Sequence, residues 1–239
     1  MNYNPKSLKA EEFISHEEIL ETLRFADEKK NDRAYIESIL EKAKPIYNPN
    51  GSLHCGGLNH REASVLLACE IPDLNEKMIK LAEEIKLAFY GNRIVLFAPL
   101  YLSNYCVNGC TYCPYHAKNK TIARRKLTQE EIRKEVIALQ DMGHKRLALE
   151  AGEDPVHNPI EYILESIKTI YSIHHKNGDI RRVNVNIAAT TVENYRKLKD
   201  AGIGTYILFQ ETYHKKAYEE LHPTGPKHDY CYHTEAMDR

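Results

Sequence analysis

Apolar residues follow two different periods along the chain, and the period changes near Arg93. Before that point they recur at helical spacing. One such helical face carries Leu74, Met78, Leu81, Ile85 and Ala88. Beyond Arg93, apolar runs of strand length alternate with amphipathic helical patterns. We therefore expect an N-terminal helical extension over residues 1–92 and an α/β domain over residues 93–239.

The helical extension carries local signals that place its elements. Ser15 and Glu18 have the spacing of a capping box at the start of a helix. The apolar face of that helix is expected to bury Ile19, Leu20 and Leu23. Prolines and glycines predict a loop over residues 45–60. A longer helix is expected to be capped by Asp73 and to end at Gly91.

Strand-and-helix units follow one another in the α/β domain. Their strands are predicted at residues 94–100, 146–150, 183–188 and 204–209. The first of these runs is apolar throughout, which predicts a strand buried on both faces. Repeated units predict a parallel sheet with right-handed crossovers, as in a (β/α) TIM-type barrel. Such a barrel has eight units in about 250 residues, so we expect a partial barrel, the first half of one truncated at its C-terminus.

Cysteines are concentrated in the loop after the first predicted strand. Cys106, Cys110 and Cys113 lie there within eight residues. Thiolates at this spacing can converge on one metal centre, and iron–sulfur clusters are held by such runs. A cubane held by three cysteines would leave one iron open to an exchangeable ligand. Two other interpretations remain open: structural zinc with His116 as fourth ligand, or a disulfide and a spare thiol, which would require an oxidising compartment.

Composition narrows the possible partners. Basic and acidic residues are almost balanced, at 33 and 34, so neither nucleic acid nor a membrane surface is indicated as a partner. No apolar run reaches the length of a membrane span and no signal peptide is visible, so a soluble, cytoplasmic protein is expected. The cysteines outside the triplet are expected to be free thiols without a ligand role: Cys55, Cys69 and Cys231.

The spacing Cys-x3-Cys-x2-Cys, with an aromatic residue before the third cysteine, resembles the signature of the radical S-adenosylmethionine (SAM) superfamily. Tyr112 matches the aromatic position and would pack near the adenine of SAM, with core packing as the alternative. The longer run from Cys106 to Lys120 resembles the tyrosine lyase branch, and within it the HydG-type [FeFe]-hydrogenase maturases. The resemblance implies a radical SAM barrel whose three cysteines hold a [4Fe–4S] cluster, with SAM bound to the open iron.

The resemblance also implies residues that bind SAM. Gly152 and Glu153, after the second predicted strand, match the motif that binds its amino group, although Ala151 replaces the first glycine of that motif. Gln210 and Glu211, after the fourth predicted strand, match the polar contacts to the ribose. From the residues alone, a solvated turn remains the alternative for Gly152 and Glu153.

The tyrosine lyase branch implies a reaction as well. Its members cleave the Cα–Cβ bond of L-tyrosine to p-cresol and dehydroglycine, and the maturases use a further C-terminal domain to turn dehydroglycine into the CO and cyanide ligands of the hydrogenase H-cluster. Implied partners are L-tyrosine, an electron donor such as ferredoxin or flavodoxin, and the other hydrogenase maturases. The half-barrel alone is expected to be inactive. The alternatives are a 2-iminoacetate synthase of thiazole biosynthesis or, outside the enzymes, a zinc or iron–sulfur module with a structural or electron-transfer role.

Overall fold

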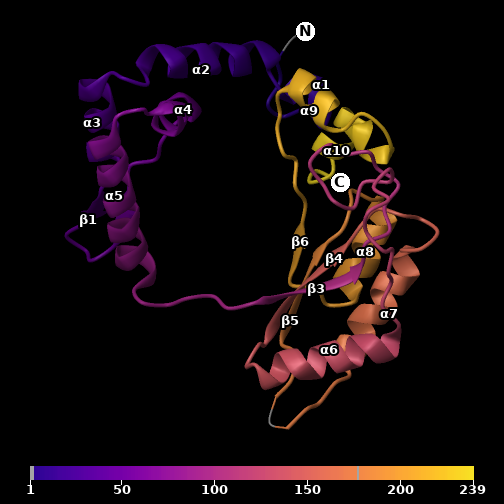
Figure 1. The fold of residues 1–239 in the computed structure, drawn as a ribbon. Helices are drawn as coiled ribbons and strands as arrows, with labels where there is room; N and C mark the ends of the chain where they lie inside the picture. The colour runs from indigo at the N-terminus through magenta and orange to yellow at the C-terminus, as the bar shows by residue number, and fades with distance from the viewer. Residues whose placement is uncertain (1–2, 177) are drawn as a thin grey trace. The chain divides into compact units, whose positions relative to one another are not determined.

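The structure is a computed structural model that describes residues 3–176 and 178–239 (Figure 1). The chain forms two compact units, each with its own hydrophobic core. One unit consists of residues 15–94, and the other combines the segment that ends at Ile14 with residues 95–239. Within the described part of the chain, no helix has both the length and the apolar character that crossing a membrane requires.

The unit formed by residues 15–94 is mainly helical. Its elements are α2 (His16–Lys29), α3 (Arg33–Lys42), β1 (Pro45–Tyr47), β2 (Leu53–Cys55), α4 (His60–Ala68) and α5 (Pro72–Tyr90). Ser15, Asp32 and Asn59 begin α2, α3 and α4, because each side chain accepts a hydrogen bond from a backbone N–H in the first turn. The core of this unit includes Ile36, Ile39, Val65, Leu74 and Leu81.

The buried face of α2 differs from the predicted one. Leu20 and Leu23 are 40% and 53% exposed, so their predicted burial is wrong. The buried residues of this helix are Thr22 and Ala26. Helix α4 packs against α2 on that side, where Arg61 Nε donates a 2.9 Å hydrogen bond to Glu18 Oε1. A polar threonine and a small alanine therefore face the core because they fit beside α4.

Two further predictions for this unit need correction. Residues 45–60, predicted as a loop, contain the antiparallel hairpin β1–β2. Strands of three residues are too short for an alternating pattern to be recognised in the sequence. Helix α5 begins at Pro72, so Asp73 lies in its first turn and is not the cap; proline suits this position because its missing N–H would have no partner there. The predicted end of this helix at Gly91 is confirmed.

The second unit is organised around a parallel sheet in the order β3-β4-β5-β6. Its strands are β3 (Ala98–Ser103), β4 (Arg146–Ala151), β5 (Arg182–Asn186) and β6 (Thr205–Ile207). Its helical elements are α1 (Ala10–Phe13), α6 (Gln129–Asp141), α7 (Ile160–Tyr171), α8 (Val192–Asp200), α9 (Lys215–Leu221), the 3₁₀ turn η1 (Pro226–His228) and α10 (Tyr230–Thr234). The predicted α/β partial barrel is confirmed, and β3 and β6 are the edges of the described sheet.

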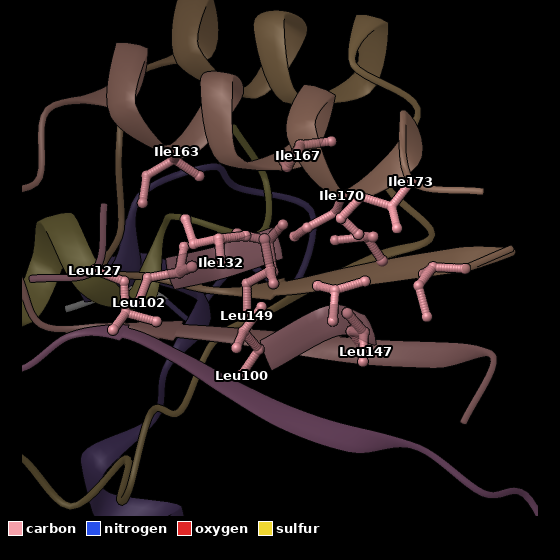
Figure 2. Packing of buried hydrophobic residues seen from close by; sticks show 14 of the residues in the cluster. Leu100, Leu102, Leu127, Ile132, Leu147, Leu149, Ile163, Ile167, Ile170 and Ile173 are labelled. Carbon is pink, nitrogen blue, oxygen red and sulfur yellow. The ribbon is translucent and has the colours of Figure 1, made fainter. Parts of the chain in front are cut away.

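Helices α6, α7 and α8 contribute buried side chains to the core on one face of this sheet. Figure 2 shows Ile163, Ile167 and Ile170 of α7 lying over the strands. The sheet contributes alternate residues of its strands to the same core: Leu100, Leu102, Leu147, Leu149, Val183 and Val185. The residues between them face the opposite side, which corresponds to the interior in a closed barrel.

The first strand is shifted relative to its prediction. It begins at Ala98, and the side chains of residues 94–97 are between 55% and 77% exposed. Ala98 pairs with Leu147, the second residue of β4, so residues 94–96 lie before the start of that strand. The predicted burial on both faces is also wrong, because Pro99, on the face away from the helices, is exposed.

Truncation of Ile167 to alanine should measure how tightly α7 packs on the sheet. The side chain is 1% exposed, so its removal leaves a cavity and is expected to lower the free energy of unfolding by about 2–5 kcal/mol. Met142→Ala is the matched control, because Met142 is 73% exposed and its truncation should cost less than about 0.5 kcal/mol. Urea titrations of both variants measure the difference. Equal losses would contradict this description of the core.

Candidate metal centre

The three clustered cysteines border one cavity of about 270 Å³ at the carboxyl ends of the strands. Cys106, Cys110 and Cys113 follow the end of β3 at Ser103. Cys110 is 6% exposed, and burial raises the pKa of its thiol. Thiols that share one cavity and lie in one loop fit a centre ligated by several sulfur atoms.

The backbone of the cysteine loop is bonded to two other segments. Val107 N–H donates to the carbonyl of Glu153 at 2.8 Å. Gly109 N–H donates to the carbonyl of Thr224, and Thr111 N–H to that of Leu221, both at 2.9 Å. A Cβ atom at Gly109 would lie 2.2 Å from Thr224 Oγ1, so any larger residue there would force the Thr224 side chain to move.

Asn108 connects the same three segments through its side chain. It is 3% exposed, and its Nδ2 donates to Glu153 Oε2 at 2.6 Å. Nδ2 also lies 3.8 Å from Cys106 Sγ, within reach of a weak hydrogen bond to sulfur. Its Oδ1 accepts from the backbone N–H of Lys227 at 2.8 Å. This asparagine thereby fixes the position of Glu153 beside the cysteine loop.

The end of β4 meets the cysteine loop at Gly152. A Cβ atom on this residue would lie 2.4 Å from the carbonyl oxygen of Tyr105 and 2.9 Å from Cys106 Cβ, so only glycine fits. Glu153 follows it and borders the same cavity. Burial raises the pKa of the Glu153 carboxyl, while the hydrogen bond from Asn108 and the charge of Lys227 act in the opposite direction. A carboxylate here could accept hydrogen bonds from an ammonium group in the cavity.

A second polar group borders the same cavity and centres on the hydroxyl of Tyr112. The hydroxyl lies 2.9 Å from Glu211 Oε1, 2.9 Å from His222 Nε2 and 3.2 Å from Lys227 Nζ. Lys227 Nζ also donates to Glu211 Oε1 at 3.2 Å. Burial acts to raise the pKa of Glu211, but the hydrogen bonds from Tyr112 and Lys227 outweigh it, so the pKa is lowered. Glu211 is therefore a carboxylate whose charge is compensated at the cavity edge.

The structure brings together most of the predicted site residues. The three cysteines, Tyr112, Gly152, Glu153 and Glu211 all border the cavity. Gln210 is not among the lining residues, since its Nε2 donates to Thr234 Oγ1 at 2.9 Å.

Sequence reasoning missed four of the residues at this site: Asn108, His222, Lys227 and His233. The last three lie more than 100 residues beyond the cysteines, and no local pattern connects them with the loop. The polar run after His222 was the available signal, but it did not indicate which of its side chains reach the cavity.

The remaining cysteines lie apart from the triplet. Cys55 is in β2, Cys69 is buried in the core of residues 15–94, and Cys231 is in α10. Across the described residues, no three His, Cys, Asp or Glu side chains converge closely enough to hold a single metal ion. A [4Fe–4S] cluster does not require this, because each cysteine ligates a different iron atom. All six cysteines are free thiols in the structure.

Comparisons with known proteins agree with the cysteine motif and the fold. A sequence model of the radical SAM superfamily matches residues 100–239. The solved structure of HydG, a maturase of the [FeFe]-hydrogenase, is 58% identical with a TM-score of 0.83, and the match covers 95% of this chain and 47% of that one. The HydG structure from Carboxydothermus hydrogenoformans is 37% identical with a TM-score of 0.76, covering 94% of this chain and 51% of that one.

A relative of known function is also similar in sequence to this chain. The 2-iminoacetate synthase of Salmonella typhimurium is 30% identical over 188 residues, which are 79% of this chain and 48% of that protein. The chain thus spans about half the length of the relatives it matches. The resemblance to HydG-type maturases drawn from the cysteine motif is confirmed. The chain belongs to the radical SAM superfamily, whose members use a [4Fe–4S] cluster and S-adenosylmethionine.

Proposed function

We propose that Cys106, Cys110 and Cys113 hold the [4Fe–4S] cluster and leave its fourth iron open to SAM. The shared cavity and the position of the thiols beside Glu153 support this assignment. When bound and reduced, these cofactors supply a 5′-deoxyadenosyl radical. The role of the protein is to hold SAM in one orientation and to exclude water from a reactive primary radical.

The SAM contacts follow from the two polar groups of the cavity. Glu153 and the backbone of Gly152 accept hydrogen bonds from the amino group of SAM. Glu211 accepts from the ribose hydroxyls, and Tyr112 packs near the adenine. Gln210 donates a hydrogen bond to Thr234, and we propose that it positions the neighbouring Glu211 in this way. Two carboxylates that border one cavity, each with its own polar partners, can accept from the two donor-bearing parts of SAM.

The reaction we propose is cleavage of the Cα–Cβ bond of L-tyrosine to p-cresol and dehydroglycine, towards the CO and cyanide ligands of the [FeFe]-hydrogenase H-cluster. The observation that carries it is the cysteine loop joined to Glu153 in a chain 58% identical to a HydG maturase. A 2-iminoacetate synthase is the second candidate, because one such enzyme is 30% identical to the chain. Both candidates are radical SAM carbon–carbon lyases acting on tyrosine.

The proposed reaction implies further partners. An electron donor such as ferredoxin or flavodoxin would reduce the cluster, and the other hydrogenase maturases would receive the product. We also propose that the protein acts in the cytoplasm, because cluster-ligating thiols must stay reduced and that compartment keeps them so.

The test of this function is turnover by the full-length protein after anaerobic reconstitution. With SAM, dithionite and L-tyrosine, we expect 5′-deoxyadenosine and p-cresol in chromatographic analysis, and CO captured by deoxymyoglobin. p-Cresol without CO would favour the 2-iminoacetate synthase. 5′-Deoxyadenosine without p-cresol would contradict tyrosine cleavage while leaving the radical SAM assignment intact.

Substitution of Glu153 by alanine should weaken SAM binding more than cluster assembly. The variant loses a charge-assisted contact to an ammonium group, worth about 1.5–3 kcal/mol or roughly ten- to hundredfold in affinity. Equilibrium dialysis with labelled SAM measures the affinity, and iron analysis measures the cluster. Glu193→Ala is the matched control, since its side chain is 77% exposed on α8. A Glu153 variant with normal SAM affinity would return this residue to a purely structural role.

A further inference from the structure

Tyr101, Glu150 and Asn186 form a row across three neighbouring strands. Tyr101 of β3 pairs with Glu150 of β4, and Glu150 pairs with Asn186 of β5. The sequence neighbours Leu100, Leu149 and Val185 are buried in the core beneath the helices, so the row faces the opposite side of the sheet. We call these three residues the inner row.

The inner row borders the same cavity as the cysteines. On β4 it lies two residues before Gly152, and therefore on the next layer of the same face towards the start of the strands. A molecule placed between the inner row and the cysteine loop would contact both. No role proposed above for SAM uses the inner row.

The carboxylate of Glu150 is the charged group of the inner row. Its Oε2 accepts a 2.5 Å hydrogen bond from Asn186 Nδ2, which holds the two side chains together. Burial raises the pKa of this carboxyl, and the bond from Asn186 acts against that rise. A carboxylate offers about four acceptor positions, so the bond from Asn186 leaves capacity for a donor from a bound molecule.

Aromatic rings accompany this carboxylate. Tyr101 and Tyr115 both border the cavity, as does Glu150. Rings at these positions provide flat apolar surface beside a hydrogen-bond acceptor. That combination suits a planar aromatic ring with a donor at its edge.

The charges of the cavity orient such a molecule. Among the described residues that line it, Lys227 is the one lysine or arginine, and it lies with Tyr112 and Glu211 rather than at the inner row. A carboxylate group would be repelled by Glu150, whereas a hydroxyl would donate to it. Lys227 attracts the α-carboxylate of an amino acid, and the α-amino group is attached to the same carbon, so the aromatic end would face the inner row.

We propose that the inner row is the subsite for the phenol hydroxyl of an aromatic amino acid, with Glu150 as the acceptor. This assignment rests on the proposed tyrosine lyase function and adds the residue that selects the hydroxylated ring. A site built to hydrogen-bond a hydroxyl rejects the analogue that lacks it, because its buried polar group is left unpaired. The inner row thus distinguishes L-tyrosine from L-phenylalanine.

The experiment compares L-tyrosine and L-phenylalanine binding to the full-length, cluster-loaded protein with SAM present, by equilibrium dialysis. Glu150→Leu should weaken tyrosine binding about tenfold or more, because only tyrosine donates to the carboxylate. Phenylalanine binding should be unchanged or stronger, because the substitution removes the carboxylate that this analogue leaves unpaired. Glu150→Gln keeps an acceptor oxygen and nearly the same shape, so a smaller loss of about fivefold for tyrosine alone is expected. Glu130→Gln is the matched control, with a side chain 69% exposed on α6.

Iron content and SAM affinity must match the wild type before a variant is interpreted. If Glu150→Leu does not match the wild type in these two properties, the binding data of the nearly isosteric Glu150→Gln variant are used to judge the assignment. An equal loss for both amino acids would mean that Glu150 binds the ammonium group, and no loss would mean that it binds neither; each result overturns the assignment. A wild-type protein that binds SAM but not tyrosine would instead refute the proposed function, and this assignment with it.

Discussion

Replacing Cys110 by alanine should leave the protein without its [4Fe–4S] cluster and unable to cleave SAM. Cys110 is the most buried of the three thiols at the site and lies between the other two in sequence. The wild-type protein offers three cysteine ligands for the four irons of the cubane, and the variant would offer only two. We expect loss of the EPR signal of the reduced cluster. Formation of 5′-deoxyadenosine should fall by at least about a thousandfold, because the reaction depends on this cluster.

Cys231→Ala is the control for this experiment. Cys231 is a free thiol in α10 outside the triplet, and its removal should leave iron content and SAM cleavage unchanged. The EPR spectrum is recorded with SAM present, so that the cluster with an open iron is the one scored. A Cys110 variant that still forms the cluster with an open iron would require a different ligand set.

Adding a single methyl group at Gly152 should disable the site almost as completely. In Gly152→Ala, the new Cβ would lie 2.4 Å from the carbonyl oxygen of Tyr105 and 2.9 Å from Cys106 Cβ. Backbone atoms cannot yield as a flexible side chain can, so β4 and the cysteine loop must separate. We expect a loss of about 1–3 kcal/mol in the free energy of unfolding. Because the same shift displaces Cys106 and Glu153, iron content and SAM affinity should fall as well.

The matched variant is Gly57→Ala, because a Cβ on that glycine would meet nothing within 4 Å. It carries the same chemical change and should leave iron content, SAM affinity and thermal stability unaltered. Iron analysis, SAM dialysis and melting curves compare the two. Normal cluster loading in Gly152→Ala would show that the loop and the strand can move apart without harm.

The sequence was sufficient for those features of the fold and site that depend on neighbours along the chain. The predicted alternation of strands and helices after Arg93 is present, and Ser15, predicted to begin a helix, caps α2 by accepting from the Glu18 N–H. The cysteines could be recognised as ligands because all three lie within eight residues of sequence. Local hydrogen bonds and local spacing leave a direct trace in sequence.

The errors arose where distant contacts decide the outcome. Residues 94–97 are as apolar as a buried strand, but residues 94–96 lie before the start of β4 in register. Leu20 and Leu23 lie on the exposed side of α2 because α4 occupies the other side. Lys227 reaches Tyr112 across 115 positions of sequence, a contact that only the folded chain reveals. In each case the deciding partner was absent from the local pattern.

The backbone bonds of the cysteine loop bear on the order of events when the cofactor arrives. Val107, Gly109 and Thr111 donate to carbonyls of Glu153, Thr224 and Leu221, and none of these bonds involves a thiol. The conformational entropy of the loop is therefore lost during folding of the polypeptide, not during cluster insertion. The apoprotein should already protect these three amides from hydrogen exchange, and loading the cluster should change their protection little.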